Sequence, residues 1–162
     1  MRRVLTFALA AMLAVAALPV LAQSSKPNFA GQWALVPDAN AASGGMGMMA
    51  GDMTIAQNEK TVTITRSLPQ FGDMKSVYNL DGSDSSNTLN LGGNDVTMVS
   101  KAKWDGSKLT IKTSFDVGGQ SAETSMSLSL DGSGNLLVES TRPDFQGGGG
   151  PVTTKATYKK KS

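Results

Sequence analysis

The stretch Phe29-Ala30-Gly31-Gln32-Trp33 decides the fold that this sequence predicts. Phe29, Gly31 and Trp33 fall on every second residue, which is the period of a β-strand with one buried face. About eight or nine further short segments with the same period follow, and Gly, Asp and Asn residues separate them. The sequence therefore predicts an all-β protein, an antiparallel up-and-down β-barrel of about nine or ten strands.

The connections between the predicted strands are short, which favours a barrel over a sandwich with long Greek-key crossings. Three Asp-Gly-Ser turns mark them, at residues 81–83, 105–107 and 131–133. Glycine supplies the positive φ that tight hairpins need, so each turn predicts a hairpin. Closing such a meander into a barrel removes the exposed sheet edges.

Residues 1–22 predict a signal peptide, and residues 23–162 the barrel domain. Arg2 and Arg3 precede the uncharged apolar run 5–20. Val20-Leu21-Ala22 fits the small-residue pattern at which a signal peptide is cleaved. The run is shorter than the ~20 residues that span a bilayer. We therefore expect a protein of the bacterial periplasm or a secreted protein, with no membrane span in its mature form.

Composition excludes several classes of function. Removing Arg2 and Arg3 leaves equal numbers of basic and acidic residues. The sequence also lacks the basic stripe that is typical of nucleic-acid-binding proteins, so we expect no nucleic-acid binding. The chain has no Cys and no His, which excludes disulfides, thiol nucleophiles, Ser-His-Asp triads and His- or Cys-bound metals. The Asp residues lie in predicted turns. We therefore expect no enzyme and no cofactor.

Two patterns resemble metal sites, and neither predicts one. Four Met residues at positions 46, 48, 49 and 53 could bind Cu(I), but without His or Cys beside them we expect a flexible hydrophobic portal or a disordered loop. Asp131, Ser133 and Asn135 have a calcium-loop spacing, but Leu136 stands where that loop needs Gly. We expect a turn there, and no metal.

The predicted barrel interior is the first candidate site. Its inward-facing positions mix bulky side chains, Met98, Phe115 and Met126, with hydroxyl side chains such as Thr113. A dry core would need a hydrogen-bond partner for each buried hydroxyl, whereas a solvated or ligand-filled cavity tolerates them. The alternative is a narrow barrel in which small residues fit and side chains fill the interior.

Two further residues have two interpretations each. Arg66 shares a face with Val62 and Ile64, so it either points inward and binds an anionic headgroup or lies at a solvated rim. The rim is the more usual place, because Arg is rarely buried unpaired. Tyr158 is either a ligand contact or a core tyrosine with a satisfied hydroxyl.

Three motifs resemble the calycin barrels, namely lipocalins, fatty-acid-binding proteins and small exported bacterial relatives. Phe29-x-Gly31-x-Trp33 is similar to their first-strand motif. The segment 103–112, which begins Lys-Trp-Asp-Gly, resembles a late hairpin of fatty-acid-binding proteins, and the segment 157–160 resembles their last strand. The resemblance implies structural roles for Phe29, Gly31, Trp33 and Trp104.

The same resemblance implies that Trp33 closes the bottom of the barrel. In lipocalins a basic residue of the last strand stacks on this tryptophan, and Lys155 and Lys159 are the candidates here.

Departures from the family limit what the resemblance implies about the ligand. Fatty-acid-binding proteins hold the ligand carboxylate with two arginines and a tyrosine. The aligned positions here are Thr113, Ala156 and Tyr158, so only the tyrosine is retained. A Met/Gly loop, residues 44–51, replaces their helical lid. The resemblance thus implies a barrel with a cavity and does not carry over fatty-acid binding.

These observations predict an exported, non-catalytic barrel that binds or carries a small apolar or amphipathic ligand. The loops 44–51 and 146–151 are the expected mouth of the cavity. The alternative is a side-chain-filled barrel that acts as a structural or protein-interaction module, whose protein partner the sequence does not identify. The candidate ligand-binding residues are Arg66, Met98, Thr113, Phe115, Met126 and Tyr158.

Overall fold

The computed structural model describes residues 26–37, 51–68, 72–91, 94–117, 119–144 and 149–162. The predicted signal peptide, most of the Met/Gly loop and residues 146–148 of the second expected mouth loop lie outside these residues, so those predictions remain predictions. Within the described residues, the regular structure consists of ten β-strands and no helix.

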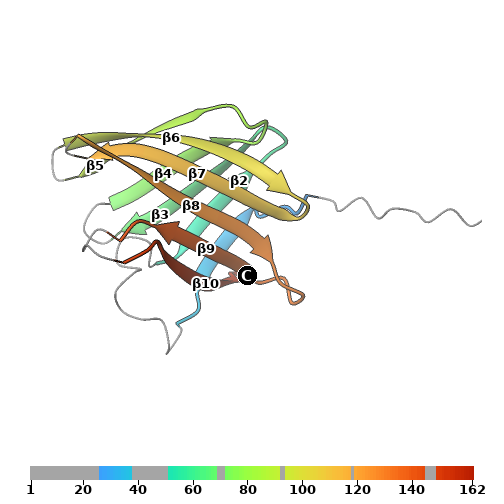
Figure 1. The fold of residues 1–162 in the computed structure, drawn as a ribbon. Coiled ribbons are helices and arrows are strands. Elements are labelled where there is room, and N and C mark those ends of the chain that lie inside the picture. The colour runs from blue at the N-terminus through green and yellow to red at the C-terminus, as the bar shows by residue number, and fades with distance from the viewer. Residues whose placement is uncertain (1–25, 38–50, 69–71, 92–93, 118, 145–148) are drawn as a thin grey trace, which may run out of the picture.

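The ten strands form one antiparallel sheet that curls into an up-and-down barrel (Figure 1). Their order in the sheet is β4-β3-β2-β1-β10-β9-β8-β7-β6-β5, so the last strand pairs with the first. This confirms the predicted all-β barrel of about nine or ten strands. The strands are β1 (Gly31–Leu35), β2 (Met53–Gln57), β3 (Thr61–Leu68), β4 (Gly72–Asn79), β5 (Ser85–Leu91), β6 (Asn94–Asp105), β7 (Lys108–Val117), β8 (Gln120–Leu130), β9 (Leu136–Arg142) and β10 (Val152–Lys160).

All three Asp-Gly-Ser segments form turns, but the glycine with the positive φ differs in the third. Gly82 and Gly106 have positive φ angles of 84° and 58°, but in the third turn the positive φ, 80°, falls on Gly134 and not on Gly132. There the carboxylate of Asp131 accepts hydrogen bonds from the backbone N–H groups of Ser133 and Asn135, both at 2.9 Å. This longer turn confirms that the segment is a turn and places the glycine conformation two residues later.

The barrel is nearly closed, and β4 and β5 form its seam. The Asp81-Gly82-Ser83 turn connects these two strands, but they are not paired through their backbones, so the hairpin predicted there is wrong. The side chain of Asn87 on β5 takes the place of a backbone rung: its Oδ1 accepts from the N–H of Val77 at 2.8 Å, and its Nδ2 donates to the carbonyl of Val77 at 3.0 Å.

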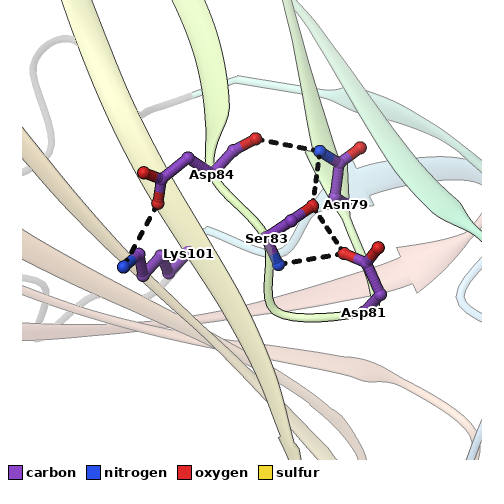
Figure 2. A network of polar contacts seen from close by, with 5 residues as sticks. All are labelled: Asn79, Asp81, Ser83, Asp84 and Lys101. Carbon is purple, nitrogen blue, oxygen red and sulfur yellow. Dashed lines mark hydrogen bonds and ion pairs between the residues drawn. The ribbon is translucent and has the colours of Figure 1, made fainter.

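Polar side chains hold the turn end of this seam (Figure 2). The Nδ2 of Asn79 donates to the carbonyl of Asp84 at 2.9 Å and to the hydroxyl of Ser83 at 3.1 Å. The backbone N–H and the hydroxyl of Ser83 both donate to Asp81, and Lys101 forms an ion pair with Asp84 at 3.3 Å. The hydrogen bonds from Ser83 lower the pKa of Asp81 below its ordinary value. At the seam, side-chain contacts therefore hold β4 and β5 together, whereas backbone pairing holds neighbouring strands together elsewhere in the barrel.

One part of the barrel interior is filled by large apolar side chains, and we call it the packed half. Phe29, Leu109, Leu128 and Leu136 are each 0% exposed there, and Trp33 is 2% exposed. The indole N–H of Trp33 donates to the carbonyl of Phe29 at 2.9 Å, so the two aromatic residues of the first-strand motif are joined by a hydrogen bond.

Trp104 packs on this core from the β6–β7 hairpin. Its ring stacks on Phe29, with ring centroids 5.7 Å apart and planes 11° from parallel. The ammonium group of Lys26 lies 5.7 Å from the centroid of the same indole, within the range of a cation–π contact. Phe29 thus contacts both tryptophans of the chain and links Trp104 to the packed half.

Lys160, and neither Lys155 nor Lys159, lies over Trp33, which corrects the residue expected to stack there. Its Nζ is 5.7 Å from the centroid of the Trp33 ring, because the β1–β10 register sets Trp33 opposite Lys160. Lys155 and Lys159 are exposed. Gly31 has a φ of 148°, and a Cβ there would lie 2.5 Å from Cε of Lys160. The glycine of the first-strand motif therefore leaves room for the lysine that covers the tryptophan.

Candidate ligand-binding site

A cavity of about 260 Å³ lies inside the barrel beyond the packed half. We call this region the hollow half and define it by the residues that line the cavity. The apolar ones are Ile64, Met74, Leu89, Met98, Ile111, Phe115 and Met126, and the polar ones are Arg66, Ser76, Tyr78, Asn87, Ser100, Thr113, Thr124, Ser125, Ser140, Thr141, Arg142 and Thr154.

The cavity lies where small inward-facing side chains on several neighbouring strands interrupt a series of larger ones. On β7, Leu109 and Ile111 are buried, and Thr113 follows them on the same face. On β8, Leu128 is buried and Thr124 lies four residues before it. Protein interiors are normally close-packed, so replacing large side chains by small ones across several neighbouring strands leaves a space.

Arg66 points into this space, so its expected place at a solvated rim is wrong. The residue is only 4% exposed, and its Nη2 donates to the sulfur of Met126 on the opposite wall at 3.5 Å. The alternation of β3 explains this position, because Ile64 is buried on the same face. The residues directly opposite Arg66 are Met53 on β2 and Met74 on β4, so its stem lies between apolar side chains.

The charged groups of the cavity wall are both basic. Among the described residues that line it, the ionised side chains are those of Arg66 and Arg142, and none is a carboxylate. A charge in a buried, low-dielectric site interacts more strongly with an opposite charge than it would in water. Burial raises the pKa of Tyr78, which also lines the cavity, so its hydroxyl stays protonated at neutral pH. The wall therefore favours an anionic group over a cationic one.

The structure brings most of the sequence-predicted ligand-binding residues together. Arg66, Met98, Thr113, Phe115 and Met126 all line the cavity. Thr113 stands where the fatty-acid-binding resemblance has an arginine, and Arg66 brings a guanidinium into the same cavity from β3 instead.

Tyr158 does not line the cavity. It is 1% exposed and belongs to the hydrophobic core. Of its two interpretations from the sequence, the structure therefore agrees with the core tyrosine. Burial raises the pKa of its hydroxyl, and the nearby charge of Arg66 acts in the opposite direction.

Sequence reasoning did not identify several residues of the cavity wall, and three of them are Arg142, Met74 and Asn87. Arg142 ends β9 two residues after Ser140, so the alternation of that strand carried the signal for it. Met74 belongs to the wall because β4 already begins at Gly72. Asn87 carried no signal, because its role depends on the missing pairing between β4 and β5.

Neither a metal cluster nor a membrane-spanning helix is found in the described part of the chain. No group of three or more His, Cys, Asp or Glu side chains in it could hold a metal ion. None of its segments is a helix long and apolar enough to cross a bilayer.

Comparison with known proteins gives one kind of match. No protein-family model and no curated protein sequence matches the chain. A solved structure, the zebrafish ileal bile acid-binding protein in complex with cholic acid, is similar with a TM-score of 0.56 and 18% identity. The match covers 82% of this chain and 98% of that one. The likeness establishes the fold alone, and it confirms the predicted calycin-like barrel.

Proposed function

We propose that this protein is an exported, non-catalytic carrier that binds a small anionic amphiphile in the cavity of the hollow half. The observation that carries the proposal is the guanidinium of Arg66, 4% exposed and inside a cavity of about 260 Å³. A cavity that combines apolar side chains with placed polar groups is typical of sites for small molecules.

The two kinds of lining residue support two parts of one ligand. Apolar side chains such as Ile64, Leu89 and Phe115 would contact an apolar body, whose burial contributes about 25 cal/mol per Å². Arg66 would bind the anionic group, because a guanidinium presents five N–H donors in a planar fork that suits carboxylate and phosphate. The solved structure with a similar fold is a bile acid-binding protein in complex with cholic acid, which is itself an anionic amphiphile.

Two sequence features support the non-catalytic and exported parts of the proposal. The chain contains no His and no Cys, and the described cavity wall contains no carboxylate, so no acid–base pair faces a ligand there. Residues 1–22 have the charge and apolar pattern of a signal peptide.

The alternative of a structural or interaction module rests on a barrel whose interior is filled. The packed half fits that description, with Leu109, Leu128 and Leu136 each 0% exposed. The cavity beyond them does not, and it favours the carrier over the module.

A fluorescence titration with a matched pair of probes tests the proposal. Dansyl-undecanoic acid and its methyl ester share one apolar body and differ in the anionic group. We expect the wild-type protein to bind the acid more tightly than the ester. Arg66→Met should weaken binding of the acid by about tenfold to a hundredfold, since a hydrogen bond to a charged group contributes about 1.5–3 kcal/mol. Binding of the ester should hardly change.

The control is Lys103→Met, which removes one positive charge from the exposed outer face of β6. It should leave binding of both probes unchanged. Equal affinity of wild-type protein and Arg66→Met for the acid would contradict the proposal, provided that both proteins unfold at similar temperatures.

A further inference from the structure

Five hydroxyl side chains from five consecutive strands line the cavity, and we call them the hydroxyl row. Ser100 on β6 lies directly opposite Thr113 on β7, and Thr113 lies opposite Thr124 on β8. On the next two strands, Ser140 of β9 lies opposite Thr154 of β10. Side chains at directly opposed positions are about 4.5–5.5 Å apart, so the row is a continuous band within each group.

The two groups of the row meet at the β8–β9 boundary. Ser140 is the partner of Met126, and Thr124 lies two residues from Met126 on the same face of β8. Thr124 and Ser140 are therefore diagonal neighbours, which are about 7–8 Å apart in an antiparallel pair. All five residues of the row line the cavity.

Apolar residues border this band on both sides over β6 and β7. Met98 lies opposite Phe115 along one border, and Ala102 lies opposite Ile111 along the other. Over β6 and β7 the hydroxyl row is thus a polar stripe between two apolar borders.

The hydroxyls of the row keep bonding capacity for a ligand. The Oγ atom of Ser100 and the Oγ1 atom of Thr113 are 2.8 Å apart and share one hydrogen bond. Each hydroxyl has one donor and two acceptor positions, so a single shared bond leaves several positions of this pair unused. A purely apolar ligand would cover these groups without replacing the water that otherwise satisfies them, which is unfavourable.

We propose that the ligand of this cavity carries hydroxyl groups along one side of its apolar body, and that these groups bind the hydroxyl row. This inference rests on the proposed function and adds the class of ligand to it. The anionic group binds Arg66, whose Nη2 is 3.5 Å from the sulfur of Met126, beside Thr124 and Ser140 on the same wall. The chemical class is a hydroxylated anionic amphiphile.

A series of competing ligands tests this assignment. Stearic, hydroxystearic and dihydroxystearic acid share one chain and one carboxylate and differ in their hydroxyl groups. Each competes with dansyl-undecanoic acid, and the decrease in probe fluorescence measures its affinity. We expect each added hydroxyl to tighten binding by about twofold to tenfold, the range of a net hydrogen bond. A purely apolar wall predicts the opposite order, because a buried hydroxyl without a partner weakens binding.

The decisive variant is Thr113→Val/Thr124→Val, which removes two hydroxyls of the row and keeps the branched shape of the side chains. It should abolish or reverse the preference for hydroxylated acids. Thr97→Val makes the same substitution at an exposed position of β6 and should keep the preference. If the double variant unfolds at a much lower temperature, Ser140→Ala gives the same test from β9.

The outcomes separate this inference from the proposed function. Failure of dansyl-undecanoic acid to bind overturns both. Binding of all three acids without a preference for hydroxyl groups, or a preference that survives Thr113→Val/Thr124→Val, overturns the hydroxylated ligand and leaves the anionic amphiphile standing.

Discussion

The packed half and the hollow half of the barrel are built on the same strands, yet their interiors differ. On β7, Leu109 is 0% exposed and lies outside the cavity wall, whereas Ile111, Thr113 and Phe115 further along line the cavity. The strand period is the same in both halves, so alternation decides which residues point inward and side-chain size decides whether they fill the space. Position along a strand therefore separates residues that stabilise the barrel from residues available to a ligand.

The largest expected effect comes from truncating one inward residue in each half. Leu109→Ala should lower the free energy of unfolding by about 2–5 kcal/mol, because it leaves a cavity in a close-packed core. Thr113→Ala, on the same face of the same strand, should lower it by about 1 kcal/mol or less, since it mainly removes the hydrogen bond to Ser100. Urea denaturation measures both. Equal losses would break the distinction between the two halves.

A smaller effect is expected at the seam between β4 and β5. Asn87→Ala removes both hydrogen bonds to the backbone of Val77 and should cost about 1–3 kcal/mol of stability. Hydrogen exchange of the Val77 amide should become faster. Thr88→Ala changes the exposed neighbour of Asn87 and should leave that amide protected. Unchanged exchange of Val77 in Asn87→Ala would show that the side-chain rung does not hold the seam.

The smallest effect concerns the turns beside the packed half. Hydrogen bonds from the Asn135 side chain and then from backbone N–H groups hold the pKa of Asp131 below its ordinary value. A lowered folded-state pKa contributes stability above the unfolded pKa of about 4, and this contribution is lost as the pH falls through the folded value.

Asp131→Ala should therefore reduce the thermal stability of the protein at neutral pH and make it less sensitive to acid. Thermal unfolding followed at neutral and acidic pH measures this, with Glu59→Ala, an exposed carboxylate, as the control. A wild-type protein and an Asp131→Ala variant that lose stability in parallel on acidification would contradict the role of this turn.

Strand faces were predictable from the sequence because alternation is a local property. It placed Met98, Thr113, Phe115 and Met126 on the inward face, and all four line the cavity. The same alternation placed Arg66 with Val62 and Ile64. Arg66 was expected at the rim only because burial of an arginine is unusual. The cavity that accommodates it is formed by strands far away in the sequence, so the sequence alone did not reveal it.

Features that depend on register between strands were not predictable. Lys160, and neither Lys155 nor Lys159, covers Trp33 because the β1–β10 register sets Trp33 opposite Lys160 and Ala34 opposite Lys159. The seam has the same origin, since an Asp-Gly turn joins β4 and β5 as it joins the paired strands β6 and β7. Local turn chemistry is alike in the two places, and the difference arises from the closure of the whole barrel.

Native mass spectrometry of the protein purified from the cells that produce it tests most directly whether the hollow half holds an anionic amphiphile. We expect a complex with one small molecule per chain. After extraction into organic solvent, that molecule should ionise as an anion and partition as an amphiphile. A bare protein mass, together with no uptake of dansyl-undecanoic acid, would contradict the claim and favour the filled-barrel module.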